Sequence, residues 1–106
     1  MFSHVMVGTN DIEESRIFYD KIFEVLGAGP GKMYPNLTGQ KRYFYNLHGT
    51  SFCISEPIDG NPATVSNGAT IGFNIESIEN KEILISNRYD FKNLKEFRCV
   101  KIIGWF

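Results

Sequence analysis

The chain opens with a strand-like run that passes through a short polar loop (residues 8–11) straight into a capped helix. Residues 2–7 alternate with period two, which places Val5 and Val7 on one face of a strand and His4 and Met6 on the other. The two valines favour a pleated surface because they are β-branched. The pattern therefore predicts a strand that sets a polar, metal-capable histidine among apolar residues.

The helix that follows has clear start and stop signals. Asp11 can cap the free N–H groups, Glu14 completes a capping box, and Glu13 adds a charge that suits the helix N-terminus. Gly27 offers a left-handed end. Mainly apolar residues recur at three- and four-residue spacing between these signals: Ile12, Ser15, Phe18, Tyr19, Ile22, Val25 and Leu26. The simplest packing lays this helix over the valine face and leaves His4 on the opposite, concave side of a sheet.

Size and charge set limits on the function. With 106 residues, of which 42% are hydrophobic, the chain is expected to form one domain. A formal charge of -1 gives no electrostatic footprint for nucleic acid or for an anionic membrane. Neither a run of roughly 20 apolar residues nor a signal-peptide pattern is found. We therefore expect a cytoplasmic protein that binds neither nucleic acid nor membrane, with Cys53 and Cys99 as buried, reduced thiols.

The middle of the chain is typical of antiparallel sheet. Residues 27–40 are rich in Gly, Pro and Asn and predict a long connection with a short strand near residues 32–35. Residues 42–47 and 51–56 form two strand-like runs around His48-Gly49-Thr50, which is a hairpin signal. Residues 1–57 therefore predict a β-α-β-β-β unit.

A second unit is expected after a linker at residues 58–67. Adding 66 to the numbers of the first unit maps Val5 onto Ile71 and Val7 onto Phe73, and the helix cap onto Ser77. Helix residues 17–19 then map onto Ile83, Leu84 and Ile85. This order predicts a duplicated module over residues 68–106, with a strand near residues 70–73 and a helix near residues 78–85.

These residues resemble a known group of proteins. His4-Val5-Met6-Val7, Asn10-Asp11-Ile12, Phe18-Tyr19 and Leu26-Gly27 are similar to the opening motif of the vicinal oxygen chelate superfamily, which contains glyoxalases, bleomycin resistance proteins and extradiol dioxygenases. The runs at residues 57–64 and 67–73 look like the linker and second-module opening of small glyoxalase-like members. The resemblance implies an α+β, glyoxalase-like fold: a βαβββ module plus a reduced second βα(β) module, with a curved mixed sheet and a concave pocket.

The resemblance also implies candidate metal ligands. His4 matches the first-strand histidine of the family, and Glu56 lies close to where members can place a carboxylate. The position of a second histidine is taken by Thr70, a weak ligand for zinc, nickel, manganese or iron. The final carboxylate position is not evident after Asp90, so the second module is expected to be shortened. We expect either no cofactor or one divalent ion whose site a partner chain completes.

Three functions stay open at this stage. The first is a small-molecule-binding protein of glyoxalase/bleomycin-resistance type without a complete metal site. The second is a metal-dependent lyase or dioxygenase whose site is completed across a dimer, and the third is an inactive, truncated relative. Met6, Tyr43, Tyr45 and Thr70 are the candidate pocket residues, although the tyrosines could equally belong to the core. The apolar run at residues 102–106 predicts a homodimer that covers it.

Overall fold

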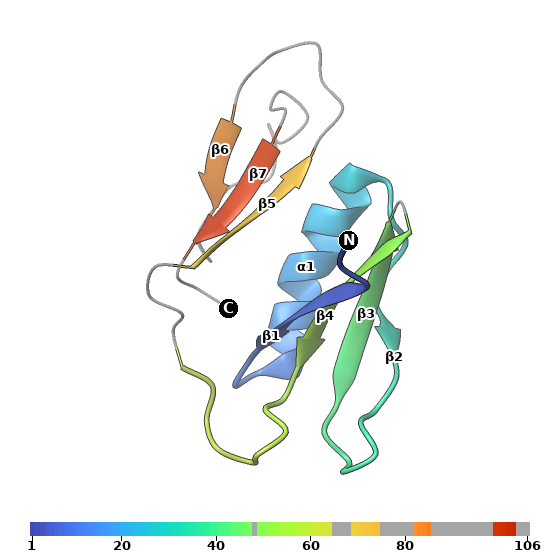
Figure 1. Ribbon diagram of the computed structural model, residues 1–106, viewed down its shortest axis with the longest axis vertical. Coiled ribbons are helices and arrows are strands. Elements are labelled where there is room, and N and C mark those ends of the chain that lie inside the picture. The colour runs from blue at the N-terminus through green and yellow to red at the C-terminus, as the bar shows by residue number, and fades with distance from the viewer. Residues whose placement is uncertain (48, 65–68, 75–81, 86–98, 104–106) are drawn as a thin grey trace. The chain divides into compact units, whose positions relative to one another are not determined.

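The computed structural model describes residues 1–47, 49–64, 69–74, 82–85 and 99–103. The chain divides into two units, Met1–Thr64 and Val65–Phe106. Each unit has its own sheet (Figure 1).

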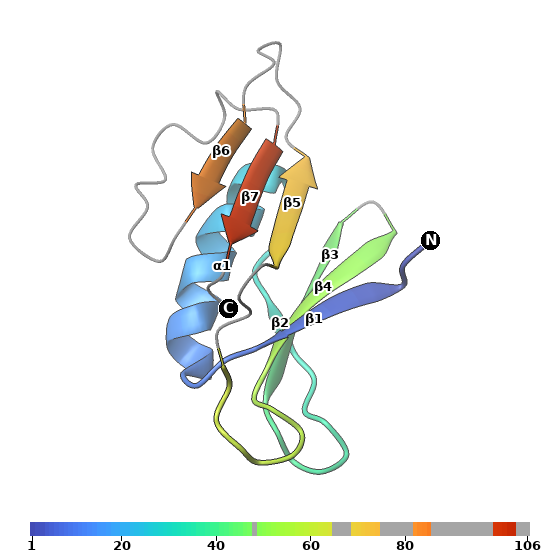
Figure 2. The ribbon, with the colours of Figure 1, turned by 60° about the vertical axis from the view of Figure 1, so that its left-hand side comes forward.

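The first unit is a four-stranded mixed sheet with one helix on one of its faces. Its elements are β1 (His4–Gly8), α1 (Ile12–Leu26), β2 (Lys32–Met33), β3 (Arg42–Leu47) and β4 (Thr50–Ser55). The sheet order is β1-β4-β3-β2, with β1 parallel to β4 and the other pairs antiparallel. The turned view in Figure 2 shows α1 and this sheet as separate layers. The predicted β-α-β-β-β order is confirmed.

The ends of α1 follow the sequence signals, with one difference in the capping box. The Asp11 carboxylate accepts from the Glu14 N–H at 3.1 Å, and Gly27 ends the helix with a φ of 93°. The Asp11 N–H donates to Thr9 Oγ1 at 3.2 Å, so Thr9 takes the part that was expected of the Glu14 side chain. Thr9 suits this position because its hydroxyl also reaches Ser15 and ties the loop to the first helical turn.

The face of the sheet that α1 covers holds the core of the unit. We call it the covered face, and its strand residues are Val5, Val7, Tyr43, Tyr45, Phe52 and Ile54. The Phe23 ring stacks on the Tyr45 ring with centroids 4.5 Å apart and planes at 12°. The helix stripe differs at its end from the prediction, since Phe23 is buried and Val25 and Leu26 are half-buried. Phe23 replaces the predicted residues in the buried stripe because its ring stacks on the Tyr45 ring.

The opposite face of the same sheet is turned away from α1, and we call it the open face. Because side chains alternate along each strand, the register assigns these residues to it: His4, Met6, Gly8, Lys32, Arg42, Phe44, Asn46, Ser51, Cys53 and Ser55. His4 and Met6 are exposed while Val7 is buried. The prediction that the helix lies over the valines and leaves His4 on the other side is confirmed.

The described part of the second unit is a three-stranded sheet. Its strands are β5 (Thr70–Asn74), β6 (Glu82–Ile85) and β7 (Cys99–Ile103), in the order β5-β7-β6. β5 confirms the strand expected near residues 70–73. The helix expected over residues 78–85 is wrong for its last four residues, because β6 pairs with β7 in parallel. A short apolar run such as Ile83-Leu84-Ile85 suits a buried strand as well as a helix, and pairing with β7 decides between them.

Other predictions for this unit lie outside the described residues. They include the cap at Ser77 and the tail beyond Ile103, so the homodimer inferred from residues 102–106 stays a prediction. Across the described ranges, no helix combines the length and apolar character needed to cross a membrane.

Candidate functional site

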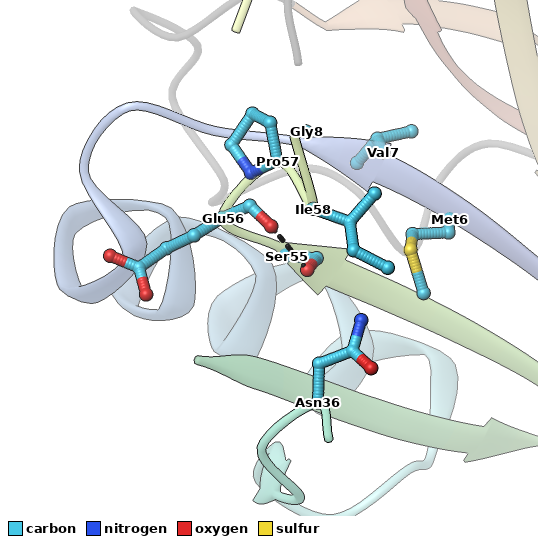
Figure 3. A pocket seen from close by; sticks show the side chains of 8 residues that line it. All are labelled: Met6, Val7, Gly8, Asn36, Ser55, Glu56, Pro57 and Ile58. Carbon is cyan, nitrogen blue, oxygen red and sulfur yellow. Dashed lines mark hydrogen bonds between the residues drawn. The ribbon is translucent and has the colours of Figure 1, made fainter. Parts of the chain in front are cut away.

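A hollow of about 410 Å³ lies where β1 and β4 end, at the edge of the open face. Its lining comes entirely from the first unit: Met6, Val7, Gly8, Asn36, Ser55, Glu56, Pro57 and Ile58. Figure 3 shows the Met6 and Ile58 side chains pointing toward one another across this space. The volume falls within the range of about 300–1,000 Å³ that is usual for small-molecule pockets.

Two loops form the walls of the hollow, and backbone hydrogen bonds tie them together. The segment after β4 is held to the segment before β3 by the Glu56 N–H, which donates to the Lys41 carbonyl at 3.0 Å. Farther along, Asn10 makes two hydrogen bonds with the backbone of Ala63, of 3.0 and 2.7 Å. The chain after Ser55 is thereby folded back beside Gly8, where a Cβ atom would meet Ala63 Cβ at 3.4 Å and Pro57 Cγ at 3.6 Å.

The chemistry of the hollow is mainly apolar and neutral. Asn36 Oδ1 accepts from the Leu37 N–H at 2.8 Å. Figure 3 shows the Asn36 amide directed toward Ile58. The Ser55 hydroxyl donates to the Glu56 carbonyl at 2.7 Å. The Glu56 carboxylate accepts from the Lys41 N–H at 2.7 Å and points away from Met6 and Ile58 in Figure 3. The hollow can therefore enclose an apolar group and offer it a few neutral hydrogen-bonding groups.

His4 and Glu56, the two candidate metal ligands, lie at opposite ends of the β1-β4 pair. The register places His4 beside Ser51, five residues before Glu56 on the same strand. At about 3.3 Å per residue, the Cα positions of His4 and Glu56 are roughly 16 Å apart along the strand direction. Donor atoms that share one zinc ion lie within about 4.5 Å of each other. The strand register therefore places the two candidates apart, and among the described residues no hydrogen bond joins their side chains.

The immediate neighbours of His4 are neutral. Ser3 Oγ lies 2.8 Å from His4 Nδ1, while Ser51 beside it hydrogen-bonds to Asn46. Among the described residues, no group of three or more His, Cys, Asp or Glu side chains is arranged to hold a metal ion. A metal site completed by another chain stays a prediction.

The four candidate pocket residues fall into three places. Met6 lines the hollow. Tyr43 and Tyr45 do not line it: their hydroxyls donate to Glu13 Oε1 at 2.7 Å and to Asp20 Oδ1 at 2.6 Å, on the covered face. Period two dictates this placement, since both residues share the face of Ile54 and Phe52. Thr70 begins β5 in the second unit, whereas the hollow is formed within the first.

Sequence reasoning missed several residues at the open face. Asn36 was expected in the long connection at residues 27–40 and Ile58 in the linker at residues 58–67, and both line the hollow. Arg42 was treated as the start of a strand, although it stands beside Ser55 on the open face. The sequence did contain a signal for Arg42. Because side chains alternate along residues 42–46, Arg42 and Phe44 lie on the face of the strand that does not carry the two tyrosines.

Electrostatics also separate the two faces. On the covered face, the Tyr43 hydrogen bond and then Arg16 hold the pKa of Glu13 below its usual range. Burial, followed by the hydrogen bond to Asp20, raises the pKa of Tyr45. On the open face, burial raises the pKa of the Cys53 thiol to about 11, and the nearby Arg42 cation opposes this shift. The prediction of a buried, reduced thiol is confirmed for Cys53, while the Cys99 side chain lies outside the described residues.

Comparison with known proteins supports the family resemblance. No protein-family model and no curated protein matches the chain. The chain is similar to the crystal structure of a glyoxalase/bleomycin resistance protein from Albidiferax ferrireducens T118, with 42% sequence identity over 79% of this chain and a TM-score of 0.55. The chain spans 56% of that protein's length. This identity and the α+β, βαβββ architecture of the first unit support the place of the chain in the vicinal oxygen chelate superfamily, which includes the glyoxalase/bleomycin resistance proteins.

Proposed function

We propose that this protein binds a small, predominantly apolar molecule in the hollow at the end of β1 and β4. The observation that carries the proposal is the lining itself: Met6, Pro57 and Ile58 supply apolar surface, and Asn36 and Ser55 supply neutral polar groups. The volume of about 410 Å³ suits a molecule with one or two rings.

The charge state of the lining also favours binding over metal-assisted chemistry within one chain. Glu56, the carboxylate at the hollow, is engaged by the Lys41 N–H. His4 is at the far end of the strand pair and has Ser51 rather than a carboxylate beside it. These donors do not fit one divalent ion, so we derive no step through a metal.

A neutral fluorescent probe tests this function on the full chain. N-phenyl-1-naphthylamine, which brightens in apolar surroundings, is titrated against the wild type and two matched variants. Ile58→Ser removes an isoleucine at the hollow that is 64% exposed, whereas Ile17→Ser removes one on α1 that is 50% exposed. Since both side chains are largely exposed, neither change should unfold the chain.

We expect saturable binding that Ile58→Ser weakens roughly fivefold, equivalent to about 1 kcal/mol of lost apolar contact. Ile17→Ser should leave the affinity unchanged. Equal effects of the two variants, or no saturable binding by the folded wild type, would contradict the proposal.

A further inference from the structure

Arg16 on α1 and Arg42 at the start of β3 differ in the charged groups that surround them. Arg16, on the covered face, pairs with Glu13 at 2.9 Å and with Asp20 at 3.1 Å, and its guanidinium lies 5.7 Å from the Tyr43 ring centroid. Arg42, on the open face, lies 5.1 Å from the Phe44 ring centroid. Within the described ranges, no carboxylate lies at ion-pair distance from Arg42. Arg16 is neutralised by its neighbours, whereas the described residues supply no such partner for Arg42.

Hydrogen bonds to the backbone hold the Arg42 side chain on the segment that leads into Asn36. Its Nε donates to the Tyr34 carbonyl at 3.0 Å and its Nη2 to the Pro35 carbonyl at 3.4 Å. The next residue, Asn36, lines the hollow, and the backbone partner of Arg42 on β4 is Ser55, which also lines it. The guanidinium has five N–H donors, so donors remain for a ligand on a side chain that is already fixed.

The charged residues near Arg42 on the open face do not neutralise its positive charge. The open face carries Lys32 beside Phe44 as a second cation, and no Asp or Glu belongs to its strand residues. The nearest lining carboxylate, Glu56, is held by the Lys41 N–H and turned away from the space between Met6 and Ile58. An anionic ligand group at this rim would meet a positive charge with no competing acid from the described strands of the sheet.

We propose that the ligand of the hollow is an amphipathic anion, whose apolar body contacts Met6 and Ile58 and whose acidic group is bound by Arg42. This inference rests on the proposed function, since it assigns a charge to the molecule that the hollow takes. Arg42 suits the task because a planar guanidinium can bind a carboxylate through two parallel hydrogen bonds.

A matched pair of probes separates the charge from the apolar body. Calorimetric titration compares 1-naphthylacetic acid with 1-naphthylacetamide, which have the same ring system, on the full wild-type chain. We expect the acid to bind about tenfold more tightly than the amide, the usual scale of a charge-assisted hydrogen-bond pair. Added salt should reduce this preference and leave amide binding nearly unchanged.

Three variants assign the preference to a residue. Arg42→Gln should abolish the preference for the acid, and Arg16→Gln, the matched arginine on the covered face, should retain it. Arg42→Lys keeps the charge without the planar fork and should retain part of the preference, which provides a second test if Arg42→Gln fails to fold. Circular dichroism checks the fold of each variant.

The outcomes distinguish the two proposals. Equal binding of acid and amide by the wild type would overturn the anion assignment and leave small-molecule binding standing. A preference for the acid that survives in folded Arg42→Gln, or that Arg42→Lys and Arg16→Gln alter equally, would also overturn it. Binding of neither probe would count against both proposals.

Discussion

The two faces of the first unit's sheet use the same strands for different purposes. On the covered face, Tyr45 and Phe23 are 1% and 2% exposed, and Arg16 is paired with two carboxylates. On the open face, Met6 is 43% exposed, and the Arg42 side chain contacts the Tyr34 and Pro35 carbonyls and the Phe44 ring. Because strand side chains alternate, neighbouring residues in the sequence fall on different sides of this division. The packed core lies on the covered face, and the binding site that we propose lies on the open one.

The largest expected effect comes from removing a phenylalanine from each face. Phe23→Ala should lower the free energy of unfolding by about 3–5 kcal/mol, because it leaves a cavity beside Tyr45. Phe44→Ala should cost about 1 kcal/mol, since the half-buried ring contributes mainly contacts with Arg42 and Tyr34. Urea unfolding followed by circular dichroism measures both. Similar costs would show that the faces do not differ in packing.

A smaller effect is expected where the loop after α1 approaches the covered face. A Cβ atom on Gly31 would lie 2.8 Å from the Tyr45 Cζ and Oη atoms, and stacking on Phe23 prevents the ring from moving freely. Gly31→Ala should therefore destabilise the chain by about 2 kcal/mol.

Gly29→Ala is the control for that substitution, because no atom would lie within 4 Å of its Cβ. It should be neutral or slightly stabilising. The same unfolding experiment measures both glycine variants, and equal free energies for the two would refute the contact with Tyr45.

Cys53 sharpens the comparison because it belongs to the open face and is nevertheless fully buried. Burial raises the pKa of its thiol from 9.0 to about 11. The stabilisation from the neutral thiol is present below the ordinary value and is lost as the pH rises toward about 11. The melting temperature should fall over that interval, and less so in Cys53→Ala. Peptide mass spectrometry should find slow alkylation of Cys53 at neutral pH, and rapid labelling of the folded chain would argue against burial.

The smallest effect concerns the charged groups at the edge of the covered face, Glu13 and Arg16. The Tyr43 hydroxyl holds the pKa of Glu13 below its ordinary value of 4.5, and Arg16 adds to this. The stabilisation is therefore present above the ordinary value and disappears as the pH falls through the lowered one. Tyr43→Phe should lower the melting temperature slightly at neutral pH and weaken its decline on acidification. Tyr34→Phe, on an exposed tyrosine, serves as the control, and an acid dependence unchanged in Tyr43→Phe would disprove the role of this bond.

Much of the first unit could be predicted from the sequence, because its signals are local. Asp11 and Gly27 define the helix through hydrogen bonds and backbone angles that involve nearby residues. Alternation in β1 correctly assigned His4 and Val7 to different faces. The weak point was the helix expected at Ile83-Leu84-Ile85, where pairing of β6 with β7 outweighs the helical pattern.

The site was harder to predict, because it depends on which distant residues meet. The sequence alone determined the capped helix, the hairpin, the two faces of β1 and the likeness to glyoxalase/bleomycin resistance proteins. Only the tertiary structure decided that His4 lies beside Ser51 and far from Glu56, that Tyr43 and Tyr45 belong to the core, and that Arg42 pairs with Ser55. The physical reason is that register between β1 and β4 is set by long-range packing under α1. Local preferences fix where a strand lies and which way each side chain points, but not which residue stands opposite.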